Sequence, residues 1–315
     1  MKFLDVKTDF AFKKVFGSEG SKDILISFLN ALITFPDGEI IEDLAIVDPY
    51  QIPLLKGMKD SYVDVKARLS NKTSVIIEMQ VLNVEGFEQR ILYNAAKSYS
   101  SQLVKGKKYH LLNPVIAITI TDFEMFKEIP DYKTVFRLIE KQHLIEYSGD
   151  IELIFIELPK FEKTETELVD IIDKWVFFVK NSGSLEYIPE TLAQSPAIAQ
   201  AFEIANEARL TPEEHEAQWK RLDFIMLQQG SIEYAEKIGT AKGLAVGLAK
   251  GLAEGKAEGK AEGKAEGKAE GKVEGLAEGK AEERMKNAHK MKQIGVTTDI
   301  IMQVTGLSRE EIETI

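Results

Sequence analysis

Cysteine is absent from this chain of 315 residues, and histidine occurs only four times, at positions far apart in the sequence. The absence of cysteine excludes disulfide bonds, a thiolate nucleophile and cysteine-ligated zinc or iron–sulfur sites. A metal ion would therefore have to be bound by carboxylate and carbonyl oxygens. Those ligands suit Mg²⁺ or Mn²⁺, so most zinc chemistry is excluded.

Long hydrophobic runs are also missing. No apolar stretch approaches the roughly 20 residues that a membrane-spanning helix needs, and the opening residues, MKFLDVKTDFAFKK, contain no apolar signal-peptide core. The hydrophobic share of 44% is nevertheless enough for a sizeable globular core. We expect a soluble, cytoplasmic protein of roughly two domains that has no membrane partner.

The charge balance bears on nucleic-acid binding. The formal net charge is −11, which argues against attachment to nucleic acid by overall charge. Residues 1–160 are nearly neutral, with 20 basic and 23 acidic side chains, and most of the excess negative charge lies in residues 161–240. Within the neutral part, KSYSSQLVKGKKYH (97–110) has four lysines and no acid. This stretch could contact phosphates and stack on bases, or it could be the solvated end of a helix and a turn.

Hydrophobic periodicity predicts an α/β fold for residues 1–160. Apolar residues recur at helical spacing over 9–32 and 86–104, whereas alternating or β-branched runs indicate strands. The expected strands are 42–47, 60–69, 73–82, 114–121, 134–141 and 151–158. The core order through residue 121 is therefore α-β-β-β-α-β, with SNK (70–72) as the turn of a hairpin, and 134–141 and 151–158 are further strands. Residues 161–240 show a helical pattern in which Trp175 and Phe177 are expected to pack in the core.

A four-residue repeat begins near residue 241, where glycine recurs ten times from Gly243 to Gly279. A period of four advances about 400° around a helix of 3.6 residues per turn, so the glycine stripe drifts by about 40° per repeat. Glycine and like charges four apart weaken an isolated helix. Small residues at this spacing also allow helices to approach closely. Residues 241–283 are therefore either a solvated spacer or an oligomerising helix.

The last residues, 284–315, have ordinary composition again. They divide into three short amphipathic pieces, the first two of which end in glycine. Ser308 followed by Glu311 fits a capping box that begins the third piece. The segment could be a helix-turn-helix or a small helical interaction module, and we favour the module because no recognition face is evident. The predicted domains are thus 1–160, 161–240, 241–283 and 284–315.

The hairpin at 60–82 carries the residues with potential chemistry. Residues two apart share a face of a strand, so Asp64 and Lys66 are expected to point one way, as are Glu78 and Gln80. Across the hairpin the two carboxylates can come close, and close carboxylates must share a cation or one must be protonated. A bridging Mg²⁺ would remove the repulsion and bring a water molecule. The alternative is that both carboxylates face solvent on an edge hairpin.

The same residues resemble a known family. TDFAFKKVFGSEGSKDILISFLNAL, DSYVDVKARL and VIIEMQVLNVEGFEQRILYNAAKSYSSQLVKGKKYHLLNPVIAITI are similar to the PD-(D/E)XK nuclease family transposases, also called the Rpn family of recombination-promoting nucleases. The resemblance covers most of residues 1–180 and extends to the glycine-rich tail. It implies a restriction-endonuclease-like core and Mg²⁺-dependent cleavage of double-stranded DNA.

The resemblance also assigns roles to individual residues. Asp64 and Glu78 match the metal ligands, with the backbone carbonyl of Met79 as a third oxygen ligand. Gln80 stands where the wider superfamily has lysine, and a neutral amide can replace that lysine only in part, by hydrogen bonding. Lys66 could supply the missing positive charge. The expected DNA-contacting residues are Arg90 and Tyr93, at positions usual in the family, and Lys97, Lys105, Lys107 and Lys108 in the basic stretch.

These expectations leave three functions open, of which we favour the first. The first is a Mg²⁺-dependent endonuclease, also active in vitro with Mn²⁺ or Ca²⁺, that promotes recombination by making breaks. The second is a DNA-binding or assembly protein with a nuclease-like fold and weak or no catalysis, which assembles as a homo-oligomer through the glycine-rich repeat. The third is a strand-joining transposase, against which stands the lack of a three-carboxylate arrangement and of an extended basic domain.

Overall fold

The computed structural model describes residues 2–35, 38–51, 61–103, 106 and 108–315. Lys105 and Lys107, which we expected to contact DNA, lie outside the described residues. The chain forms two compact units, Met1–Ile232 and Glu233–Ile315. Predicted boundaries near 160, 240 and 283 divide the chain more finely, and they stay predictions.

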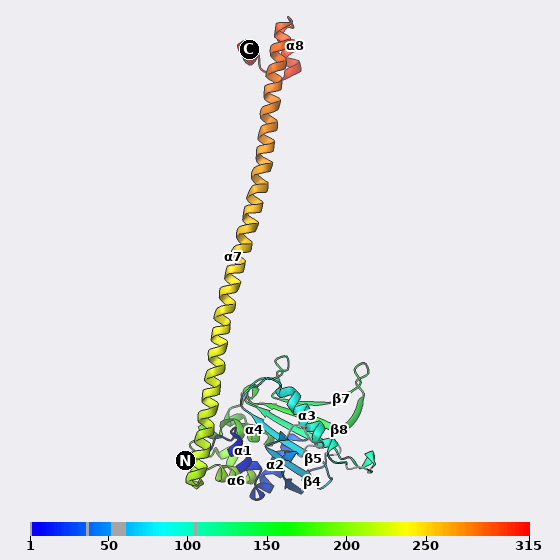
Figure 1. Cartoon of the computed structure of the whole chain (residues 1–315), viewed down its shortest axis with the longest axis vertical. Helices are drawn as coiled ribbons and strands as arrows, with labels where there is room; N and C mark the ends of the chain where they lie inside the picture. The colour runs from blue at the N-terminus through cyan, green and yellow to red at the C-terminus, as the bar shows by residue number, and fades with distance from the viewer. Residues whose placement is uncertain (1, 36–37, 52–60, 104–105, 107) are drawn as a thin grey trace. The chain divides into compact units, whose positions relative to one another are not determined.

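A six-stranded mixed sheet is the centre of the first unit (Figure 1). Its strand order is β1-β4-β5-β6-β8-β7, where β5, β6 and β8 run parallel and the outer pairs are antiparallel. The strands are β1 (Leu44–Val47), β4 (Val65–Leu69), β5 (Ser74–Gln80), β6 (Val115–Thr121), β7 (Lys133–Ile139) and β8 (Glu146–Glu157). A separate short pair consists of β2 (Tyr50–Gln51) and β3 (Ser61–Tyr62).

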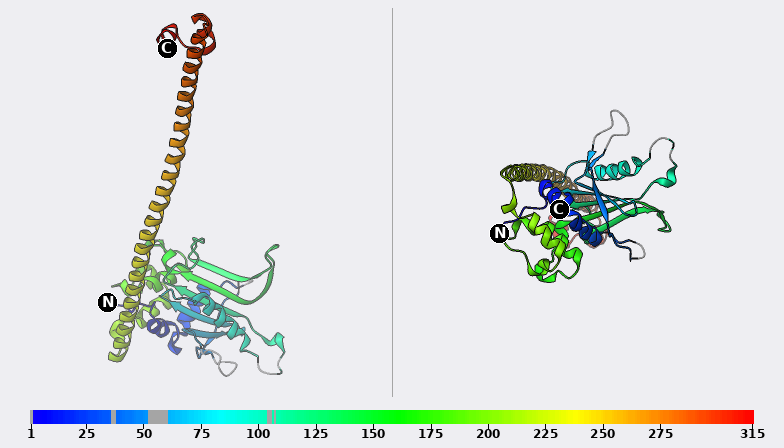
Figure 2. Two further views of the ribbon diagram at one scale, coloured as in Figure 1. Left: turned by 45° about the horizontal axis from the view of Figure 1, so that its top comes forward. Right: turned by 90° about the horizontal axis from the view of Figure 1, so that it is seen from below.

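Helices cover both faces of this sheet (Figure 2). One face packs against α1 (Asp9–Phe16), α2 (Lys22–Leu32), α4 (Ile171–Asn181), α5 (Glu190–Ala193) and α6 (Pro196–Ile204). The opposite face carries α3 (Phe87–Ser100). Short 3₁₀ turns connect these elements at Glu19–Ser21, Tyr109–Leu111, Leu158–Lys160, Glu165–Glu167, Ser182–Ser184 and Glu207–Arg209. The mixed α/β class expected from the sequence is confirmed.

The larger core lies between the sheet and α1, α2, α4 and α6. Trp175 is fully buried, and its ring meets Phe28 edge-on with centroids 5.5 Å apart. Phe177 is also buried, so both aromatic residues expected to pack do so. Burying a large aromatic side chain contributes roughly 2–3 kcal/mol, and this cluster therefore fixes the helices on the sheet.

The hairpin that carries the acidic residues differs from its expected form in one respect. β4 and β5 pair as predicted, and Lys72 takes the left-handed conformation (φ 72°) in the turn between them. The single strand expected over 60–69 is interrupted, because the chain bends at Asp64 between β3 and β4. Val63 packs with the α3 side of the sheet, whereas Val65 packs with the α1 side. Side-chain alternation is therefore broken at Asp64.

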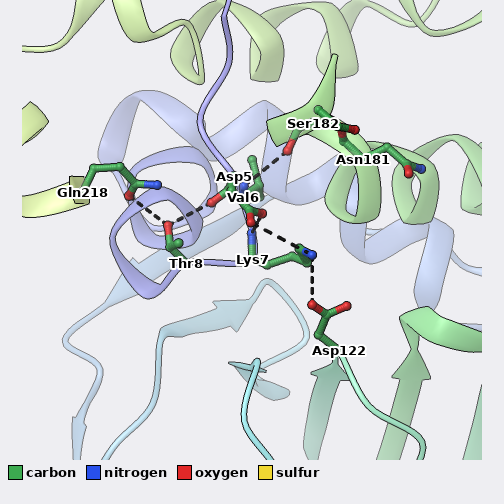
Figure 3. Close-up of polar contacts among 9 residues, drawn as sticks. Asp5, Val6, Lys7, Thr8, Asp122, Asn181, Ser182 and Gln218 are labelled. Atoms are coloured by element: carbon green, nitrogen blue, oxygen red, sulfur yellow. Dashed lines mark hydrogen bonds and ion pairs between the residues drawn. The ribbon is translucent and has the colours of Figure 1, made fainter. Parts of the chain in front are cut away.

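The N-terminal segment before α1 is fixed by polar contacts with distant parts of the first unit (Figure 3). The backbone N–H of Val6 donates to Ser182 Oγ at 3.2 Å. Thr8 Oγ1 lies 2.9 Å from Gln218 Oε1, and it also accepts the N–H of Ala11 as the N-cap of α1. These bonds connect the beginning of α1 to the 3₁₀ turn at Ser182–Ser184 and to Gln218.

One helix, α7 (Pro212–Gln293), runs continuously through the glycine repeat. It is followed by α8 (Thr298–Thr305) and α9 (Arg309–Thr314), which pack on its end through Ala288, Ile301 and Ile312. The expected capping box is present, since the Ser308 hydroxyl accepts from Glu311 N and the Glu311 carboxylate accepts from Ser308 N. Among the described residues, no helix combines the length and the apolar character needed to cross a membrane.

Candidate active site

The acidic residues of the hairpin come together where β4 begins and β5 ends. Asp64 Oδ2 accepts the backbone N–H of Met79 at 2.8 Å, and the Asp64 N–H donates to the carbonyl of Ile77 at 3.0 Å. The bend at Asp64 thus turns its carboxylate toward β5, on which Glu78 follows Ile77. The two carboxylates are close enough for the charge of Asp64 to act on Glu78.

Both carboxylates are largely removed from water, with side chains only 13% exposed. Burial raises the pKa of Asp64, while the Met79 N–H and Lys13 act in the opposite direction. Burial also raises the pKa of Glu78, which Arg90 lowers and the Asp64 charge raises further. The charged forms of both groups are therefore disfavoured here, and a cation between them would be favoured.

Two cationic side chains and one amide contact the acidic pair. Lys13 of α1 lies 3.2 Å from Asp64 Oδ1. Arg90 of α3 lies 2.5 Å from Glu78 Oε1, and Asn94, one turn further along α3, donates to Glu78 Oε2 at 3.4 Å. Each carboxylate therefore has its own positive partner, one from each face of the sheet.

Gln80 is held at both ends of its amide. Its Nε2 donates to the carbonyl of Leu82 at 2.7 Å, and its Oε1 accepts from Arg90 Nη2 at 2.7 Å. The same nitrogen of Arg90 contacts Glu78, so the guanidinium bridges two successive residues of one strand face. Gln80 contributes hydrogen bonds to this arrangement but no charge.

Contacts from the N-terminal segment reach the same end of β5. The N–H of Asp122, just after β6, donates to the Gln80 carbonyl at 3.0 Å. The Asp122 carboxylate binds the ammonium of Lys7 at 2.9 Å (Figure 3). This chain of bonds connects the strand that carries Glu78 and Gln80 to the segment that precedes α1.

Lys66 is placed differently from the sequence expectation. It lies in β4 opposite Ile76, on the α3 side of the sheet, and the charges that act on it are Arg68 and Asp48. Burial lowers its pKa. The expectation that Lys66 shares a face with Asp64 is wrong, because the bend at Asp64 interrupts the alternation on which it depended.

The expected DNA-contacting residues are divided between the site and the surface. Arg90 and Tyr93 lie on the face of α3 that borders Glu78. Lys97 is only 3% exposed, with its ammonium 3.2 Å from Ser61 Oγ and 5.6 Å from the Tyr93 ring centroid. Lys108 is exposed before a 3₁₀ turn. Lys97 would have to leave its present contacts to reach a phosphate.

A pocket of about 740 Å³ opens beside Glu78. Its walls come from α3, the segment before it, and β3. The lining residues are Ser61, Tyr62, Glu78, Val84, Glu85, Gly86, Phe87, Gln89, Arg90, Tyr93 and Asn94. The pocket gives a ligand access to one of the two carboxylates and to the arginine that binds it.

The donor set fits a divalent metal ion. Nowhere in the described part of the chain do three or more histidine, aspartate or glutamate side chains form a metal-binding cluster. An ion between Asp64 and Glu78 would thus complete its coordination with carbonyl oxygen and water, as Mg²⁺ commonly does. The buried Oδ1 of Asn94 has no hydrogen-bond donor among the described residues, so a water molecule bound near Glu78 could satisfy it.

Lys13 and Asn94 were not identified from the sequence. Asn94 follows Arg90 by four residues and so lies on the same helix face, a signal that the sequence does contain. Lys13 is 51 residues from Asp64 along the chain, and nothing in the local pattern of either segment predicts their contact. Only the packing of α1 on the sheet brings them together.

One of three comparisons with known proteins gives a match. The family model described as PD-(D/E)XK nuclease family transposase matches residues 6–235, which include every residue of the site. Neither a search of curated proteins nor a search of solved structures gives a match. Nucleases of the PD-(D/E)XK group generally use divalent metal ions, in accord with the paired carboxylates. By its match over most of its length, the chain belongs to the PD-(D/E)XK nuclease family transposases.

Proposed function

We propose that this protein is a Mg²⁺-dependent endonuclease that hydrolyses phosphodiester bonds of double-stranded DNA and promotes recombination by making breaks. The observation that carries the proposal is the pair Asp64 and Glu78, whose side chains are each only 13% exposed and close enough for the charge of one to act on the other. Membership of a nuclease family supports the same reaction class. We also propose that the protein is soluble and cytoplasmic, a location in which it would meet DNA.

Asp64, Glu78 and the carbonyl of Met79 are the proposed ligands of Mg²⁺, or of Mn²⁺ or Ca²⁺ in vitro. When bound, the ion would lower the pKa of a water molecule and oppose negative charge on the phosphate. Hydrolysis would add water to phosphorus, break one phosphorus–oxygen ester bond and transfer a proton to the leaving oxygen. The family label "transposase" would then describe ancestry, and strand joining is not part of the proposal.

The remaining side chains position DNA and oppose its charge. Gln80 is proposed to orient the attacking water, and Arg90 and Lys66 to oppose phosphate charge. A guanidinium can bind two phosphate oxygens at once, which suits Arg90 for this role. The proposed duplex contacts farther from the cut are Tyr93, Lys97, Lys105, Lys107 and Lys108.

Plasmid nicking tests the proposal directly. Purified protein is incubated with supercoiled plasmid in Mg²⁺, Ca²⁺ or EDTA, beside Glu78→Ala and Asp64→Ala. We expect cleavage in Mg²⁺ that EDTA abolishes, and a loss of at least about 100-fold in either variant. Undiminished nicking by a folded Glu78→Ala protein would remove Glu78 from the mechanism.

A second candidate function rests on Gln80. Both ends of its amide are engaged within the protein, and no charge replaces the superfamily lysine at that position. The protein could therefore bind DNA and assemble, with the glycine-rich helix joining copies, while cleaving weakly or not at all. Gln80→Lys separates the two functions: cleavage that appears only in this variant supports the binding role.

A further inference from the structure

Gln80 leaves the site with one positive charge fewer than the lysine-containing pattern of the wider superfamily. The charge has to come from elsewhere if the phosphate is to be stabilised during hydrolysis. Arg90 is a charge that the proposed function already uses, and one of its nitrogens contacts both Glu78 and Gln80. Lys66 lies on the α3 side of the sheet, paired with Ile76, whereas Asp64 contacts Lys13 of α1.

Lys13 is positioned to supply this positive charge. Its ammonium lies 3.2 Å from Asp64 Oδ1, while the other carboxylate oxygen accepts the Met79 N–H. The Lys13 side chain is 45% exposed, so its head can turn toward a ligand that arrives from solvent. Lysine has a flexible four-carbon stem, which permits such a movement at little cost.

The helix that carries Lys13 is itself fixed. Ala11, Phe12, Val15 and Phe16 of α1 are all buried in the larger core. The neighbouring Lys14 forms an ion pair with Glu214 on α7. The backbone at Lys13 therefore cannot shift freely, and only the side chain can move.

We propose that Lys13 supplies the positive charge that Gln80 lacks. In the metal-free protein Lys13 holds Asp64 Oδ1; when a divalent ion and DNA bind, its ammonium moves to a non-bridging oxygen of the phosphate at the cut. Lys13 makes no covalent bond in this step and acts by charge alone. The inference rests on the proposed nuclease function and adds to it a residue that touches the substrate.

Competition at Asp64 gives a test that does not depend on cleavage. If the ammonium and a metal ion share Asp64 Oδ1, then Lys13→Met should bind Mn²⁺ about two- to fivefold more tightly, the affinity equivalent of a lost partly exposed ion pair. Isothermal titration of Mn²⁺ alone into DNA-free protein measures this change. Lys22→Met is the matched control, because Lys22 of α2 forms an exposed ion pair with Asp43, which directly precedes β1.

Cleavage should change in the opposite direction. We expect Lys13→Met to lose about 100- to 1,000-fold in kcat for plasmid nicking, Lys13→Arg to retain at least a tenth of wild-type activity, and Lys22→Met to be unaffected. Adding Gln80→Lys to Lys13→Met should raise kcat at least tenfold above that of Lys13→Met, because the new lysine on β5 supplies the missing positive charge. Lys66→Met should cost less than Lys13→Met.

The outcomes separate this inference from the function on which it rests. Tighter Mn²⁺ binding with weaker cleavage, rescued by Gln80→Lys, supports it. Unchanged Mn²⁺ affinity in Lys13→Met, or a larger loss in Lys66→Met than in Lys13→Met, overturns it. If wild-type protein cuts nothing in any metal, the nuclease function fails, and the Mn²⁺ titration still decides whether Lys13 competes at Asp64.

Discussion

Asp64 and Glu78 are in surroundings that disfavour their charges. The site therefore lowers the stability of the folded protein when no metal ion is bound. Burial raises the pKa of both carboxyl groups in the folded protein above the ordinary values of 3.8 and 4.5. Between the ordinary and the raised pKa the folded state binds more protons than the unfolded state. The free energy of unfolding therefore falls as the pH rises through this range.

Replacing the two carboxylates by neutral amides of the same shape should recover the stability that their charges cost. We expect Asp64→Asn and Glu78→Gln to raise the Tm of metal-free protein at pH 8, each kcal/mol recovered giving about 2–4 °C. The gain should shrink as the pH falls through the raised pKa values and vanish below the ordinary ones. Thermal melts in EDTA between pH 4 and 8 measure it.

Metal should reverse the order of stability in the same melts. Wild-type protein should gain Tm on addition of Mg²⁺, because a ligand that binds only the folded state stabilises it, whereas the variants should not. A lower Tm for both variants than for wild type at pH 8 in EDTA would show that the carboxylates contribute net stability through Lys13 and Arg90.

At the residue scale the sequence predicted the acidic pair but not its surroundings. Strand spacing and the family resemblance together singled out Asp64 and Glu78, and the structure bonds Asp64 to the Met79 N–H, next to Glu78 in β5. Their role as metal ligands stays a prediction. The placement of Lys66 was wrong because a bend is invisible to a period-two pattern. Lys13 was missed because its contact with Asp64 depends on how a helix packs.

At the scale of the elements, the hydrogen bonds that hold the beginning of α1 are the feature that we expect to matter for stability. Thr8 caps α1, and its hydroxyl also bonds to Gln218 in the interior. We expect Thr8→Ala to lower the free energy of unfolding by about 1–3 kcal/mol, from the lost cap and the buried amide left without a partner. Urea denaturation measures the change. Thr8→Ser keeps the hydroxyl and should lose well under half as much.

Gly183 lies where the N-terminal segment passes so close that a larger residue would clash with it. A Cβ at this position would lie 2.7 Å from Asp5 Cβ and 2.9 Å from Asp5 Cα, inside van der Waals contact. Gly183→Ala should therefore cost about 1–3 kcal/mol in urea denaturation, since the N-terminal segment must move. Gly20→Ala is the control, because nothing lies within 4 Å of its added Cβ. Equal stability of the two variants would contradict the packing described here.

Most elements could be predicted because their patterns are local. The β4–β5 hairpin and α3 follow from alternation, a turn and helical spacing that any short window contains. The break between β3 and β4 could not, because it lies where Asp64 bonds to the Met79 backbone on the neighbouring strand, a contact that no short window of sequence contains. Tertiary contacts override local preference at the position where the chemistry is placed.

At the scale of the whole molecule, the glycine repeat is helical despite its low intrinsic propensity. α7 continues through all ten repeat glycines, and an added Cβ at any of them would meet nothing within 4 Å outside the local helix backbone. Some exposed pairs support the helix, such as Lys250 with Glu254 at 3.9 Å. Sequence alone left a spacer and an oligomerising helix open, and both stay predictions.

Two variants of α7 distinguish these roles. Deleting residues 257–268 removes three of the ten glycines and about 18 Å of helix, whereas Gly259→Ala, Gly263→Ala and Gly267→Ala together keep the length. If the repeat is a spacer, we expect both variants to leave the Tm of residues 1–232 unchanged. The alanine variant should also be more helical, because each Gly→Ala change stabilises the helix by about 0.5–1 kcal/mol. Circular dichroism and light scattering measure helicity and mass. Loss of an oligomer in the alanine variant alone would mean that the glycines pack helix against helix, because added methyl groups block close approach without changing the length.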